Sequence, residues 1–85
     1  MKRGKAGQQV TITGIVTAAD WDEDDDIVAV TISTADEEEY LVDDNPKGEE
    51  LLELVYRNVK ATGVVEDDGE GGKLISVRSY EILDD

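Results

Sequence analysis

Apolar and polar residues alternate along most of this chain, which is the pattern of strands that have one buried face. Residues 10–19 are rich in Val, Ile and Thr, and Gly14 interrupts their alternation. Ile15 breaks the parity directly after this glycine, so we expect the strand to bend there and to serve two packing surfaces. Further strands are predicted at residues 27–34, 39–42, 58–65 and 73–83, and the first three strands should form an antiparallel meander.

One segment departs from this alternation and has the features of a short helix. Asn45 is a suitable N-cap, and Pro46 fits the first helical position, where its missing N–H has no partner in any case. Leu51, Leu54 and Val55 then follow the spacing of one helical face. We therefore predict a helix of about ten residues between the third and fourth strands.

The alternation also selects the residues that should form the core. A domain of this length needs nearly every Val, Ile and Leu inside, because small domains bury a small fraction of their surface. In segment 27–34 the buried parity is ambiguous, since Ile27 and Ala29 compete with Val28 and Val30 for the same face. The predicted core residues are Val10, Ile12, Val16, Val28, Val30, Ile32, Leu41, Leu51, Leu54, Val55, Val59, Val65, Ile75, Val77 and Ile82.

The predicted order, three strands, one helix and two strands, resembles the five-stranded Greek-key barrel of the OB fold. The long first strand with its central Gly14, the position of the helix, and the closing segments 59–65 and 74–82 carry this resemblance. The chain is most similar to the anticodon-binding-like group of small bacterial OB-fold domains, many of which have no assigned activity. The resemblance implies an all-β fold with one short helix, ordered β-β-β-α-β-β.

The resemblance also implies a domain organisation. A single OB-fold domain is expected over residues 9–84, with the helix closing one end of the barrel and Tyr56 packed beneath it. Residues 1–8 hold three of the eight basic residues and are expected to form a disordered basic tail.

Charge separates this sequence from OB-fold proteins that bind nucleic acids. Eight Lys and Arg residues face 22 Asp and Glu residues, which gives a net charge of −14. OB proteins that bind single strands combine a basic groove with stacking aromatics, but segment 27–34 has no aromatic residue and segment 39–42 has only Tyr40. The loops that usually flank an OB binding face are acidic here, at 20–26 and 66–70. Nucleic-acid binding therefore rests on family analogy alone, and the charge disfavours it.

Several kinds of chemistry are excluded by composition. The chain has neither His nor Cys, which rules out a Cys/His zinc site and any catalytic pair that depends on histidine. The glycine-rich run 69–72 lacks the Gly-Lys-Ser/Thr of a phosphate-binding loop, because Leu74 follows Lys73. We therefore expect no enzymatic activity and no cofactor.

No apolar run approaches the roughly 18–20 residues that cross a bilayer, and the negative charge disfavours anionic membranes. The sequence thus predicts a monomer without membrane contact. The cytoplasm is its default location, and a mature exported domain is the alternative.

Carboxylates alternate along the turn that joins the first two strands, as the ligands of calcium loops do. An EF-hand loop also needs Gly at its sixth position and Glu at its twelfth, where this sequence has Asp25 and Thr31. The preferred interpretation is a solvated acidic turn. The alternative is a divalent-cation (Ca²⁺) site formed by Asp20, Asp22, Asp24 and Asp26.

The leading functional hypothesis is a non-catalytic OB-type module whose acidic face binds a basic protein, a basic peptide or a small cationic ligand. A passive accessory domain, whose acids serve only solubility, is a further alternative. Trp21 is expected to cap the core, or else to form a half-exposed platform that a cation could contact. The candidate ligand-binding residues are Asp20, Trp21, Asp22, Asp24, Asp26, Tyr40, Glu66, Asp67 and Asp68.

Overall fold

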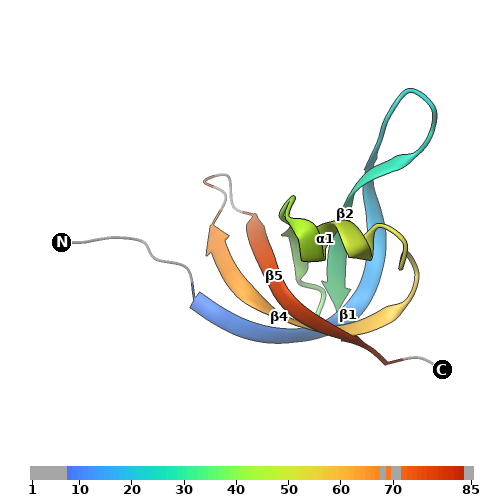
Figure 1. Cartoon of the computed structure of the whole chain (residues 1–85). Helices are drawn as coiled ribbons and strands as arrows, with labels where there is room; N and C mark the ends of the chain where they lie inside the picture. Colours follow the sequence, from blue (N-terminus) through green and yellow to red (C-terminus); the bar gives the residue numbers. More distant parts are fainter. Residues whose placement is uncertain (1–7, 68, 70–71, 84–85) are drawn as a thin grey trace.

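The computed structural model describes residues 8–67, 69 and 72–83 and contains one closed barrel of five strands (Figure 1). Around the barrel the strand order is β1-β2-β3-β5-β4, and all neighbours are antiparallel except β3 and β5, which are parallel. The predicted fold class, an OB-fold-like all-β barrel with one short helix, is confirmed. The elements are β1 (Gln8–Trp21), β2 (Ile27–Thr34), β3 (Glu39–Val42), α1 (Pro46–Leu51), β4 (Asn58–Asp67) and β5 (Lys73–Ile82).

Strand β1 closes the barrel because it pairs with two different strands. Its residues 8–15 pair with β4 and its residues 14–21 pair with β2, so the two pairings overlap at Gly14 and Ile15. A Cβ on Gly14 would lie 2.3 Å from the carbonyl oxygen of Ser33, so this close approach of β2 requires glycine. The prediction that the first strand serves two surfaces at this glycine is confirmed.

Helix α1 begins where it was predicted to begin but is shorter. Asn45 Oδ1 accepts a hydrogen bond from the backbone N–H of Gly48 at 2.7 Å, and Pro46 occupies the first turn. The helix then ends at Leu51 after six residues, because the following backbone bonds, such as Leu54 N–H to the Leu51 carbonyl, span only three residues. Leu51 is consequently the fully buried leucine of this segment, and Leu54 is only half-buried.

The core largely follows the predicted parity. Val10, Leu54, Val55 and Val65 are partly buried against it. Val42 and Ala61 belong to the core without having been on the predicted list, whereas Val28, Leu41 and Ile82 were assigned to it wrongly and are 49%, 39% and 41% exposed. The buried apolar residues are Ile12, Val16, Val30, Ile32, Val42, Leu51, Val59, Ala61, Ile75 and Val77.

The three wrong assignments have separate causes. The register between β1 and β2 shifts, so that Ala29 and Ile27 have partners in β1 but Val28 has none. Val28 is therefore an extra residue in β2, and it reverses the alternation of inward and outward side chains at this point. As a result the side chain of Val28 lies outside the core. In β3 the inward residues are Tyr40 and Val42, so Leu41 between them points outward. Ile82 is the last residue of β5, where the barrel no longer covers it.

Two further expectations concern the ends of elements. Tyr56 was expected beneath the barrel, but its side chain is 77% exposed, because its backbone turns away from the helix with a φ of 73°. The predicted basic tail, residues 1–8, lies outside the described residues except for Gln8, which begins β1.

In the described part of the chain, no helix has both the length and the apolar character that crossing a membrane requires.

Candidate binding face

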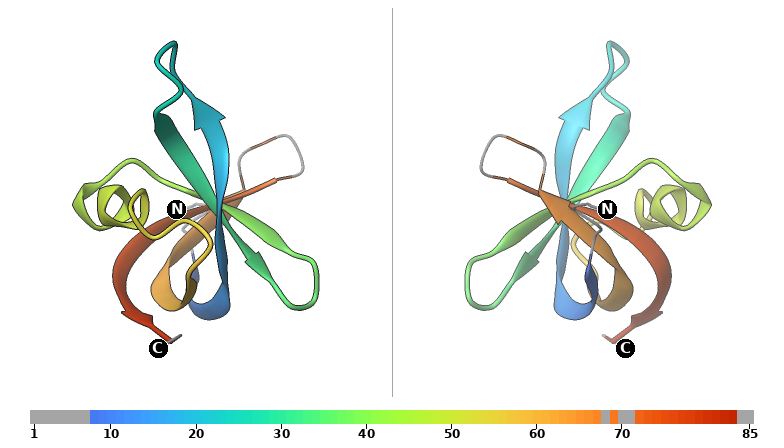
Figure 2. Two further views of the ribbon diagram at one scale, coloured as in Figure 1. Left: turned by 90° about the vertical axis from the view of Figure 1, so that its right-hand side faces the viewer. Right: turned by 90° about the vertical axis from the view of Figure 1, so that its left-hand side faces the viewer.

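Of the two hairpins that were expected to flank the binding face, the β1–β2 hairpin projects from the end of the barrel at which β4 ends and β5 begins (Figures 1 and 2). The other hairpin joins β4 to β5. Because β3 pairs with β2 on one side and with β5 on the other, it lies between these hairpins. Helix α1 packs beside the same end, on the side of the barrel opposite the β2–β3 connection (Figure 2).

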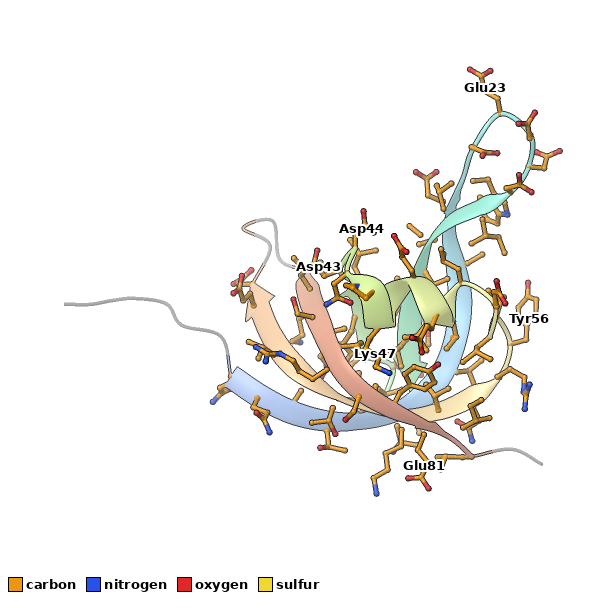
Figure 3. The ribbon with its side chains drawn as sticks, viewed as in Figure 1. Glu23, Asp43, Asp44, Lys47, Tyr56 and Glu81 are labelled. Atoms are coloured by element: carbon orange, nitrogen blue, oxygen red, sulfur yellow. The ribbon has the colours of Figure 1, made fainter. Side chains whose placement is uncertain are left out.

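The β1–β2 turn is organised by the carboxylate of Asp22. Asp22 Oδ1 accepts hydrogen bonds from the backbone N–H of Asp24 at 2.8 Å and of Asp26 at 3.0 Å. This arrangement brings carboxylate oxygens of Asp22, Asp24 and Asp26 within 4.8 Å of one another, all on exposed side chains. Glu23 lies at the tip of the hairpin and points away from the barrel (Figure 3).

Asp20 does not join this group of carboxylates. Its Oδ1 accepts a hydrogen bond from the backbone N–H of Trp21 at 2.9 Å, further down the strand. Calcium coordinates roughly six to eight oxygens, so a cation at the three remaining aspartates would have to take much of its coordination from water. The three carboxylates define an acidic turn and do not by themselves define a metal site.

Trp21 lies on the projecting part of the β1–β2 hairpin. Its side chain is 53% exposed, so the preferred prediction, a cap on the core, is wrong. The reason is the length of the hairpin: β1 continues to residue 21, beyond the last residue that it contributes to the core, Val16. The alternative prediction, a half-exposed ring on the hairpin, describes its position.

Between the hairpins, the outward side of β3 carries two adjoining hollows that share Leu41 as a wall. The first has a volume of about 260 Å³ and lies between β2 and α1. Its apolar lining includes Val28, Leu41, Leu52 and Leu74, together with Ala29 and the core residues Val30 and Val42. Its acidic lining comes from Asp43, Asp44 and Glu49. The second, about 390 Å³, is lined by Thr31, Leu41, Lys73 and the three glutamates Glu37, Glu38 and Glu39.

We call the surface formed by these two hollows the acidic face. Among the described residues, Lys73 is the one basic residue in its lining, and its ammonium is paired with the carboxylate of Glu38. The same ammonium lies 5.8 Å from the centre of the Tyr40 ring. The hydrogen bond and the charge of Glu38 raise the pKa of Lys73 above its usual 10.5. The positive charge of Lys73 is thus already offset by Glu38.

The other candidate residues divide between this face and the rest of the barrel. Glu66 and Asp67 end β4 and pair in register with Leu74 and Lys73, so they border the acidic face. Asp68 lies outside the described residues. Tyr40 packs against the core and lines a different hollow, and it borders the acidic face only through Lys73, its register partner in β5.

Sequence reasoning missed the apolar floor of the acidic face. Val28 and Leu41 were assigned to the core because β-branched and leucine side chains in strands usually lie inside. The parity of Tyr40 and Val42, with Leu41 between them, is the signal that could have placed Leu41 outside.

Comparison with protein families and with curated proteins finds no match to this chain.

Proposed function

We propose that this protein is a non-catalytic OB-type binding module whose acidic face binds a basic segment of another protein. The observation that carries the proposal is the lining of that face, where carboxylates stand at both ends and Lys73, the one basic residue in the described part of the lining, is paired with Glu38. The acids of both flanking hairpins add to the same negative potential. Positive side chains would be attracted to this surface and would approach it faster than neutral ones.

The position of Lys60 is compatible with the same ligand. Lys60 is the register partner of Glu81, and Glu81 lies at the end of the barrel opposite Asp43 and Asp44 (Figure 3). Lys60 therefore lies far from the acidic face and does not reduce its potential. A nucleic acid would bring its phosphates against unshielded carboxylates, which is why we favour a basic polypeptide over a single strand.

A titration of the labelled protein with basic peptides, followed by amide NMR, tests this proposal. We expect shifts in residues 20–26, 41–49 and 66–67 that weaken as salt is added. Replacing Asp44→Asn together with Glu49→Gln should weaken binding about threefold to tenfold, because each exposed charge contributes a fraction of a kcal/mol.

The matched control removes two charges elsewhere. Glu53 and Glu81 are exposed and line neither hollow of the face, so Glu53→Gln with Glu81→Gln should change the affinity much less. If basic peptides shift none of the named residues at low salt, the proposal is wrong. Binding of single-stranded oligonucleotides with a steep negative salt dependence would support the nucleic-acid alternative instead.

A further inference from the structure

The acidic face has an apolar floor that a purely electrostatic binding surface would not need. Val28 is 49% exposed and Leu41 is 39% exposed, and both line the hollow of about 260 Å³ beside Leu52 and Leu74. An exposed apolar patch with a rim of polar residues is a common feature of interaction sites. A ligand that covers this floor must contribute an apolar group as well as positive charge.

The size of this hollow restricts the ligand further. Sites for small molecules usually enclose roughly 300–1,000 Å³, whereas the apolar hollow is smaller and shares Leu41 with the second hollow. A space of this size suits one or two side chains of a polypeptide that continues beyond it. The shape therefore favours a peptide over a free small cation.

The outward side of β3 determines the spacing between the acidic and apolar side chains that a ligand would contact. Side chains of a strand alternate between its two faces, and Tyr40 and Val42 point inward. Glu39 and Leu41 therefore face outward, and Asp43, directly after β3, continues their row as acid–apolar–acid. The N–H of Asp43 donates to the carbonyl of Ile75, and its carboxylate accepts a 2.9 Å hydrogen bond from Ser76 Oγ. Glu39 lines one hollow, Asp43 lines the other, and Leu41 separates them.

We propose, as an extension that rests on the proposed function, that the ligand is an extended segment with one apolar residue between two basic residues. Its order is Lys/Arg-x-apolar-x-Lys/Arg. An extended chain rises about 3.3 Å per residue, the same as β3, so alternate ligand side chains match the row Glu39, Leu41 and Asp43. The central side chain lies on Leu41 and Val28, and the basic side chains meet the acids at the two ends.

Three synthetic peptides of equal length and charge test this order. The first carries Lys-Ser-Leu-Ser-Lys between Gly-Ser flanks, the second has the same composition with Leu moved outside the two lysines, and the third has Ser in place of Leu. We expect the first to bind at least about tenfold more tightly than the other two, because burial of a leucine side chain favours the complex. Equal affinities would overturn the inference but leave the proposed function intact, whereas no binding by any peptide would overturn both.

Variants of the floor complete the test. Leu41→Ser should remove the preference for the first peptide and leave the weaker, salt-dependent binding that all three share. Ile15 is 46% exposed on β1 and lines neither hollow, so Ile15→Ser is the matched control and should retain the preference. Val28→Ser gives a second test at a residue with no register partner in β1. Retention of the preference in both floor variants would contradict the inference.

Discussion

Tyr56 is an exposed residue held in a backbone conformation that suits glycine. Its φ is 73°, and the other non-glycine residues in this region of the Ramachandran plot, among those described, are Asp25 and Glu37 in the two acidic turns. The left-handed region costs an ordinary L-residue about 1–2 kcal/mol. Tyr56 keeps it because its N–H donates to the carbonyl of Val16 at 2.6 Å, which fastens the segment after α1 to β1.

Replacing Tyr56→Gly should therefore stabilise the protein by about 0.5–1 kcal/mol, since relief of the backbone exceeds the extra entropy of glycine in the unfolded chain. The ring itself is 77% exposed and contributes little. Tyr56→Ala removes the same ring but keeps a Cβ, so it should bring no such gain. Urea unfolding of both variants measures the difference, and equal stabilities would show that the backbone carries no strain at this position.

Single residues were predictable where their signals are local. Asn45 and Pro46 act within one turn of the chain, and Gly14 is required by one neighbouring carbonyl. Val28 and Leu41 were not predictable in this way, because their exposure depends on a register shift against β1 and on which face of a four-residue strand meets the core. The apolar floor of the candidate site was missed for this reason.

At the scale of elements, α1 is too short to be stable alone and depends on its contacts with the barrel. Leu51 is fully buried in the core, and Tyr80 Oη on β5 donates a hydrogen bond to Glu50 Oε1 at 2.7 Å. Lys47 lies 3.7 Å from the same carboxylate and 5.8 Å from the centre of the Tyr80 ring. The start of the helix was predictable from its cap, but its end was not, because the chain after Leu51 continues in backbone bonds that span three residues, and no residue type marks that change in the sequence.

The contact between Tyr80 and Glu50 should make part of the stability depend on pH. The hydrogen bond to Glu50 raises the pKa of Tyr80 above its usual 10.0, which means that folding favours the neutral phenol. Its contribution is present below about pH 10 and is lost as the pH rises through the folded-state value. We expect Tyr80→Phe to lower stability at pH 7 by at most about 1 kcal/mol and to reduce the loss of stability above pH 10.

Thermal unfolding between neutral and strongly alkaline pH measures this effect. Some alkaline loss should remain in Tyr80→Phe, because the pKa of Lys73 is also raised, by Glu38, and that contribution has the same sign. Tyr56→Phe is the control, since this exposed ring has no role in holding α1, and it should leave the stability at pH 7 unchanged. An alkaline limb in Tyr80→Phe identical to that of the parent protein would rule out the assigned role.

At the scale of the whole molecule, the acids of the β1–β2 hairpin and of the end of β4 lie at the same end of a small barrel, and further acids follow in the β2–β3 turn. The order of elements and the positions of the acids in the chain were enough to predict that both flanking hairpins would be acidic at their ends. Folding brings these like charges together, while the unfolded chain spreads them apart, so the net charge of −14 opposes the compact state. Anything that screens the charges should stabilise the protein, whether or not it binds at a specific place.

Added salt should therefore raise the melting temperature. Increasing NaCl from about 0.01 M to about 1 M shortens the Debye length from about 30 Å to about 3 Å, and we expect a gain of about 1 kcal/mol, or roughly 4–8 °C. Replacing Asp22, Asp24 and Asp26 by Asn keeps the acceptor of the turn, removes three charges, and should reduce this gain.

CaCl₂ and MgCl₂ at equal concentration should stabilise the parent protein equally, because screening does not depend on the identity of the cation. A saturable gain with Ca²⁺ alone, lost in the triple variant, would instead establish a calcium site at these three aspartates, because only a coordination site distinguishes the two ions by size and ligand number.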